Sequence, residues 1–78
     1  MADVTVNRAS AIATHELAAT RIAQLFGSQM AHARDLGRVA HSIGLSHTDN
    51  PFSAPGSYRA LHESWQSGWV MADAGIPP

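Results

Sequence analysis

The sequence predicts an all-α protein, a small helical hairpin in which a long or broken N-terminal helix packs on a C-terminal helix that carries both tryptophans. Fourteen of the 78 residues are alanine, the best helix former. Apolar residues recur at intervals of three and four positions along most of the chain, as they do on one face of a helix. No stretch of useful length alternates between apolar and polar residues, so no strand is expected.

The first predicted helix follows Asn7, whose side chain is a suitable N-cap because its oxygen can accept from the free amides of the first turn. The helix is expected from about Arg8 to Phe26. Its apolar stripe is formed by Ile12, Ala18, Ala19, Ile22, Leu25 and Phe26.

Gly27 and Ser28 interrupt this stripe, and residues 30–43 then continue it in the same phase. A single glycine inside a helix costs only about 1 kcal/mol relative to alanine, which is too little to force a break. We therefore expect one continuous helix that ends near Ile43, with a broken or bent helix as the alternative. Gly44 then supplies the left-handed residue of a Schellman-type cap.

The segment after this helix is rich in serine, asparagine, proline and glycine, which indicates a connection with an Asx-type turn at Asp49 and Asn50. The last helix is expected to begin near Ser57 as its N-cap, and Gly75 repeats the glycine cap at its end. One face of this helix carries Tyr58, Leu61, Trp65, Trp69 and Ala72.

Length and composition limit the classes of function. A chain of 78 residues forms a single domain, residues 1–78, near the lower size limit for independent folding. Self-association would help such a chain, and little material is left for a catalytic pocket, so we expect no enzyme, no cofactor and no small-molecule substrate. No apolar run approaches the roughly 20 residues that span a bilayer, and the N-terminus lacks the pattern of a signal peptide. A cytoplasmic protein without a membrane partner is the expectation.

Five histidines and no cysteine are relevant to metal binding. Without cysteine, a zinc site would need histidines and carboxylates brought together by folding, and the spacing of the histidines matches no ligand motif. We predict no metal site and expect the imidazoles to face solvent or to lie beside helix caps; they belong to His15, His32, His41, His47 and His62.

Three motifs follow one another in a fixed order: A-R-D-L-G-R-V-A-H-S-I-G, N-P-F and S-W-Q-S-G-W-V-M-A. Their order resembles the ribosome modulation factor family over about residues 31–74, and residues 7–30 form an additional N-terminal helix. The resemblance implies a regulator that binds the small ribosomal subunit, near the anti-Shine-Dalgarno region of its RNA, and promotes translational inactivity. The matching scaffold positions include Gly37, Gly44, Asn50, Pro51, Phe52, Trp65, Gly68 and Trp69.

These positions also have a physical interpretation of their own. Four small residues three or four apart form a shallow groove on one helix face: Ala33, Gly37, Ala40 and Gly44. Trp65 and Trp69 are the bulky side chains that can fill it, Gly68 allows the two backbones to approach, and Phe52 can close the end of the aromatic cluster. We therefore predict that the motif chiefly holds the two helices together.

The net charge of the chain affects whether it can bind RNA. Five basic residues, all arginine, and six acidic residues give a net charge of −1, which disfavours non-specific phosphate binding. Binding to ribosomal RNA then requires a focused patch, for which we nominate Arg34, Arg38 and His41 on one helix face, joined by Arg59. The alternative is ordinary surface pairing of Arg38 with Asp35 and of Arg59 with Glu63, as the spacing permits.

The first helix supports a second hypothesis. Its apolar face either packs on the tryptophan hairpin as a third helix or mediates self-association. In the second case the protein is a small dimeric interaction module, such as an inhibitor or adaptor, that binds a protein target and keeps the scaffold without binding RNA. The residues nominated for self-association are Ile12, Ile22, Leu25 and Phe26.

Overall fold

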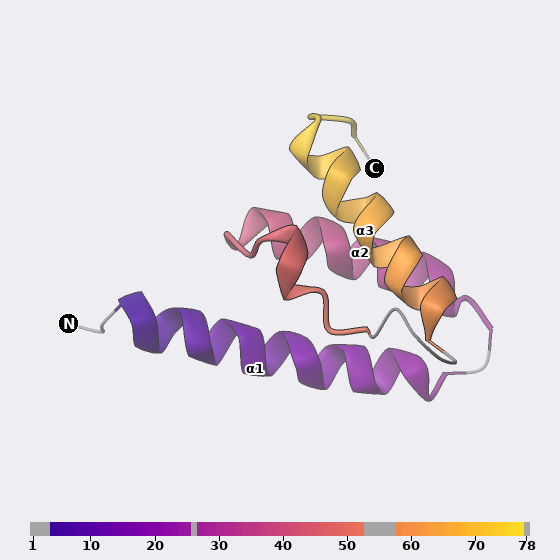
Figure 1. Ribbon diagram of the computed structural model, residues 1–78. Helices are drawn as coiled ribbons and strands as arrows, with labels where there is room; N and C mark the ends of the chain where they lie inside the picture. Colours follow the sequence, from indigo (N-terminus) through magenta and orange to yellow (C-terminus); the bar gives the residue numbers. More distant parts are fainter. Residues whose placement is uncertain (1–3, 26, 53–57, 78) are drawn as a thin grey trace.

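The computed structural model describes residues 4–25, 27–52 and 58–77, with side chains from position 9 onward. This part of the chain is all-α, as predicted, and contains no strand. Its elements are α1 (Val4–Ala23), α2 (Gln29–Ser42), a short 3-10 helix η1 (His47–Asp49) and α3 (Arg59–Asp73). Figure 1 shows α2 and α3 packed against each other, with α1 running along one side of the pair. The C-terminal end of α2 lies beside the C-terminal end of α3, where His41 contacts Asp73. The two helices therefore run in the same general direction, and the predicted helical hairpin is wrong.

The chain breaks between α1 and α2, so the expected continuous helix is wrong and the alternative of a broken helix is confirmed. Gly27 and Ser28 both adopt left-handed backbone conformations, with φ of 74° and 56°, and α2 runs back along α1 (Figure 1). The side-chain amide of Gln29 donates to the backbone oxygen of Ala23 at 3.1 Å, and so satisfies a carbonyl at the open end of α1. The small cost of glycine in a helix did not decide this point, because the break lets α1 pack on the core cluster, and most helical stability comes from such packing.

The helix starts also differ from the predictions. α1 begins at Val4, so Asn7 lies inside the helix and is not its N-cap. α3 begins at Arg59, with Tyr58 in the N-cap position and no side-chain cap bond. The predicted cap, Ser57, lies outside the described residues.

The predicted glycine caps are confirmed. Gly44 has φ 85°, and its amide donates to the backbone oxygen of His41 at 3.1 Å. The amide of Leu45 donates to the backbone oxygen of Ala40 at 2.9 Å, which completes a Schellman motif. The end of α3 repeats this pair of bonds at Gly75.

Two glycines set the distance between α2 and α3. A Cβ added at Gly37 would lie 2.0 Å from the backbone oxygen of Trp65, and one added at Gly68 would lie 1.9 Å from the backbone oxygen of Arg34. Neither helix tolerates a methyl group at this crossing without moving its neighbour's backbone. The prediction that Gly68 permits close approach of the backbones is confirmed, and Gly37 does the same from the other side.

Only part of the predicted small-residue groove faces the neighbouring helix. Ala33, Gly37 and Ala40 are buried. Gly44 is exposed, and an added Cβ there meets nothing within 4 Å, so this residue serves the helix cap and does not line the groove.

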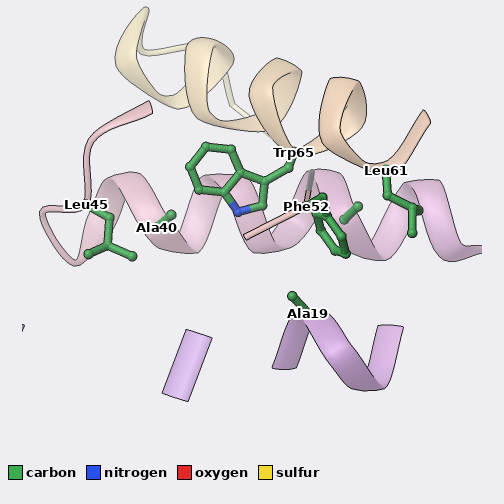
Figure 2. Close-up of a cluster of buried hydrophobic side chains, with 7 residues drawn as sticks. Ala19, Ala40, Leu45, Phe52, Leu61 and Trp65 are labelled. Atoms are coloured by element: carbon green, nitrogen blue, oxygen red, sulfur yellow. The ribbon is translucent and has the colours of Figure 1, made fainter. Parts of the chain in front are cut away.

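Trp65 is the centre of the core and has no exposed surface. Figure 2 shows its indole pointing from α3 towards the space between α2 and α1. The burial of this side chain removes more apolar area from water than any smaller residue of the core can. The other buried hydrophobic residues of the cluster are Ala19, Ala33, Ala40, Leu45, Phe52 and Leu61.

The Asn-Pro-Phe segment ties the connection to α3. The amide of Phe52 donates to Asn50 Oδ1 at 3.0 Å, which is the predicted Asx turn. Asn50 Nδ2 donates to the backbone oxygen of His62 at 3.0 Å, so one side chain fixes both the turn and its position on the helix. Asp49 has a different role: its carboxylate accepts from the amide of Ser46 at 2.8 Å, in a capping box at the start of η1.

Candidate functional site

α1 is a third helix of the fold and places part of its apolar stripe on the core between α2 and α3. Ile12 and Ile22, nominated for self-association, are partly buried against the core cluster. Leu25 is 43% exposed, and Phe26 lies outside the described residues. The fold therefore already uses two of the four nominated residues.

His15 is a functional candidate that sequence reasoning missed. It is 4% exposed, contrary to the expectation of a solvent-facing or cap-adjacent imidazole, and its Nε2 accepts a hydrogen bond from Trp65 Nε1 at 2.8 Å. Because Nε2 accepts, the imidazole is neutral and carries its proton on Nδ1. Burial lowers the pKa of His15, and the negative charge of Asp49 opposes this shift. Its place on the α1 stripe, three residues after Ile12 and four before Ala19, is the sequence signal that points inward.

The indole N–H of Trp69, like that of Trp65, has a hydrogen-bond partner within the fold. Its Nε1 donates to the backbone oxygen of Leu45 at 2.8 Å. The rings of His41 and His47 lie edge-on to it, with ring centroids 5.1 and 5.6 Å away. Both indole N–H groups of the motif are thus used within the fold, which accords with a scaffold role for the motif.

Arg38 binds the end of α3. Its guanidinium donates to the backbone oxygens of Ile76 at 3.0 Å and Pro77 at 3.3 Å. These carbonyls follow the C-terminus of α3, where a cation is electrostatically favourable. The alternative pairing of Arg38 with Asp35 is absent from the described residues.

His41 contacts the same end of α3. Its Nε2 lies 3.0 Å from Asp73 Oδ1, and both side chains are partly exposed to solvent. Together Arg38 and His41 fasten the C-terminal end of α2 to the C-terminal end of α3. Each therefore has a structural partner that an RNA phosphate would have to replace or share.

Arg34 and Arg59 lie in the N-terminal halves of α2 and α3. Arg59 Nε pairs with Glu63 Oε1 at 3.3 Å, as the spacing predicted, and both side chains are mostly exposed, so the pair contributes little to stability. Arg34 is exposed, and among the described side chains its guanidinium has no hydrogen-bond or ion-pair partner. It lines a hollow of about 440 Å³ together with Met30, Ala60, Glu63, Ser64 and Ser67. The nominated basic residues are thus divided between the N-terminal and the C-terminal halves of the α2–α3 pair.

A larger groove runs between α1 and α2. It has a volume of about 490 Å³, and none of its lining residues in the described part of the chain is an arginine or a carboxylate. His15 is among them, so the groove is apolar apart from one imidazole and two hydroxyls. The lining residues are Ser10, Ala11, Thr14, His15, Ala18, Leu36, Val39 and Ile43.

The described residues contain no group of three histidine, aspartate or glutamate side chains placed to hold a metal ion. Among the helices of the described chain, none combines the length and the apolar character needed to cross a bilayer. Comparison with protein-family models, with curated proteins and with solved structures gives no match to the chain.

Proposed function

We propose that the protein is a ribosome-associated regulator that binds the small ribosomal subunit and favours translational inactivity, as its resemblance to the ribosome modulation factor family implies. One observation carries the proposal. Motif residues on which the resemblance rests meet at a single helix crossing, where Gly37 abuts the backbone of Trp65 and Gly68 abuts the backbone of Arg34. The shared residues therefore specify a scaffold, on which surface side chains provide the contacts.

Arg34 is the best candidate for an RNA contact on that scaffold. It is exposed and has no partner among the described side chains, whereas Arg38, His41 and Arg59 each have one. The hydroxyls of Ser64 and Ser67 share its hollow. Arginine and serine are both common donors to phosphate and sugar oxygens.

The low charge of the chain determines how such binding responds to salt. For single-stranded RNA, the logarithm of affinity falls by about 0.7 per neutralised phosphate for each tenfold rise in salt. With one or two cations engaged, affinity should fall less than about tenfold between about 50 and 200 mM salt. Recognition then depends mostly on shape and hydrogen bonds.

Co-sedimentation tests the proposal in a cell extract. A tagged copy of the chain, added to a stationary-phase lysate, is expected in the ribosomal pellet at low salt and, slightly reduced, at raised salt. Absence from the pellet at low salt would refute the ribosomal function.

A second candidate is a protein interaction module, in line with the rival hypothesis from the sequence. The observation that favours it is the surface of the protein: three of the four nominated basic residues have partners within the fold, and many large hydrophobic side chains are exposed. They are Leu17, Leu25, Met30, Val39, Ile43, Tyr58, Val70 and Ile76. Such a module would remain in the post-ribosomal supernatant at both salt concentrations, in a complex with its protein target.

A further inference from the structure

A single polar contact joins α1 to α3 in the interior of the protein. His15 is 4% exposed, and its Nε2 accepts the indole N–H of Trp65, which has no exposed surface. Between the described side chains of α1 and those of α3, this is the only hydrogen bond. Because Nε2 is the acceptor, the bond exists only while the imidazole is neutral. A second proton, on Nε2, would set two N–H donors against each other and abolish it.

The surroundings of His15 offer little compensation to an imidazolium. Among the described residues, the charge that acts on it from another element is the carboxylate of Asp49 in η1, which favours protonation. Burial outweighs this attraction, because the pKa of His15 lies below its ordinary value of 6.5. On α1 itself, Glu16 is exposed. The α2 side chains that line the groove with His15 are apolar: Leu36, Val39 and Ile43.

The other histidine contacts respond to a proton in a different way. His41 Nε2 lies 3.0 Å from Asp73 Oδ1, so a charge on this ring strengthens a bond between α2 and α3. His62 Nδ1 lies 2.6 Å from the backbone oxygen of Phe52, to which it donates, and a second proton on Nε2 leaves that bond in place. Acid therefore weakens the link between α1 and α3 without weakening these two contacts.

Further bonds of the α2–α3 pair contain no group that titrates near neutral pH. Arg38 donates to the backbone oxygen of Ile76 at 3.0 Å, and arginine keeps its charge throughout this range. Trp69 Nε1 donates to the backbone oxygen of Leu45 at 2.8 Å. The pair thus has the means to stay packed when the bond to His15 is lost.

The connection between α1 and α2 is suited to act as a hinge. Gly27 and Ser28 both have positive φ, and a Cβ added at Gly27 would meet nothing within 4 Å, so the backbone there is uncrowded. The side-chain amide of Gln29 holds the C-terminal end of α1 through the backbone oxygen of Ala23, at 3.1 Å. His15 lies two turns further from the hinge, where rotation of α1 separates it from Trp65.

We propose that α1 is a pH-sensitive arm: when His15 takes up a proton, α1 detaches from the α2–α3 pair by rotation about Gly27 and Ser28, and the pair stays packed. Detachment exposes the apolar side chains that α1 places on the core, among them Ile12, Ala19 and Ile22. This conformational change goes beyond both candidate functions and does not depend on either of them.

The pH range follows from the sign of the effect. In the detached arm His15 regains its ordinary pKa near 6.5, whereas in the docked arm its pKa is lower. Docking is therefore unaffected above about pH 6.5 and weakens as the pH falls below it, until the pH passes the docked-state pKa. One proton changes the docking equilibrium constant by at most about tenfold for each pH unit.

Hydrogen exchange followed by NMR tests the proposal with the full chain, as protection relative to an unstructured chain at the same pH. Between about pH 7.5 and 5, the amides of α1 and the indole N–H of Trp65 should lose protection on the order of tenfold. The amides of α2 and α3 should keep theirs. The indole N–H of Trp69 is the internal control, because its acceptor is a backbone oxygen that does not titrate.

His15→Gln separates this residue from other titrating groups. The glutamine oxygen can accept from Trp65 and takes up no proton in this range, so protection of α1 should not change with pH. His32→Gln makes the same change at an exposed residue of α2 and should behave like the wild type. Equal losses in all three helices, no loss in α1, or the wild-type loss in His15→Gln would each overturn the proposal.

Nitrogen NMR of the wild-type imidazole gives a second readout that does not require the variant to fold. At pH 7.5 His15 Nε2 should carry a lone pair, and its protonation at lower pH should coincide with the loss of protection in α1. A proton on Nε2 at pH 7.5, or protonation while α1 stays protected, would refute the proposal.

Discussion

At the scale of single residues, a hydrogen bond between Trp65 and His15 links α3 to α1. The indole has no exposed surface, and its N–H donates to an imidazole 50 positions earlier in the chain. The bond pairs the indole N–H with the Nε2 lone pair, so neither of these two atoms is buried without a partner.

Replacement of Trp65 by alanine is expected to unfold or severely destabilise the protein. Loss of a buried aromatic side chain costs about 3–5 kcal/mol, and the change also leaves His15 Nε2 without its donor. A domain this small has little stability in reserve. Thermal unfolding followed by circular dichroism measures the effect, and an unchanged melting temperature would show that Trp65 is not part of the core.

His15 should make stability depend on pH. Burial holds its folded-state pKa below the ordinary value of 6.5, so the unfolded chain takes up the proton first as pH falls. The stabilisation is therefore complete above about pH 6.5, declines below it at up to about 1.4 kcal/mol per pH unit, and is lost once the pH passes the folded-state pKa. Urea unfolding between about pH 7.5 and 5 measures this.

The control for the pH experiment is His32→Gln, because His32 is exposed on α2. This variant should keep the pH dependence of the wild type. His15→Gln should lose most of it, at lower overall stability, and equal slopes in His15→Gln and the wild type would assign the effect to another group.

At the scale of the elements, the close crossing of α2 and α3 depends on two residues without side chains, Gly37 and Gly68. Alanine normally stabilises a helix interior by about 1 kcal/mol relative to glycine. At Gly37 and Gly68 the opposite sign is expected, because the added methyl group would lie about 2 Å from a backbone oxygen of the other helix and overpacking typically costs about 1–3 kcal/mol or more.

Chemical denaturation of Gly37→Ala and Gly68→Ala tests this prediction. Ser67→Ala, at the exposed neighbour of Gly68 on the same helix, should be nearly neutral. A stabilised glycine variant would contradict the close crossing of the two backbones.

The sequence predicted helix ends and turns correctly where residues at the position itself determine the backbone conformation. Gly44 and Gly75 end their helices because a left-handed residue is needed there, and Asn50 forms its turn through its own side chain. The break at Gly27–Ser28 was not predictable, because a local cost of about 1 kcal/mol is smaller than the free energy of docking α1.

The surface contacts were less predictable for a similar reason. Helical spacing placed Arg34, Arg38 and His41 on one helix, but the partners of Arg38 are backbone oxygens 38 and 39 positions away. The partner of His15 is equally remote. Periodicity reports which face of a helix is apolar and carries no information about which distant group meets a given polar side chain.

At the scale of the whole molecule, three helices enclose a thin core, and few cations are available for a partner. The two tryptophans of the motif hold the fold together, because both indole N–H groups donate to partners within the chain, Trp65 to His15 and Trp69 to Leu45. We therefore propose that function depends on the surface around the motif, where Arg34 lines its hollow.

The most direct test of the ribosomal proposal is equilibrium binding of the purified chain to purified small ribosomal subunits at low salt. Wild type should bind saturably, and Arg34→Ala should bind about tenfold or more weakly, because a hydrogen bond to a charged group contributes about 1.5–3 kcal/mol. Arg21→Ala, which removes the same charge from an exposed site on α1, should bind like the wild type. No binding by the wild type, or equal losses in both variants, would contradict a specific contact of Arg34 with ribosomal RNA.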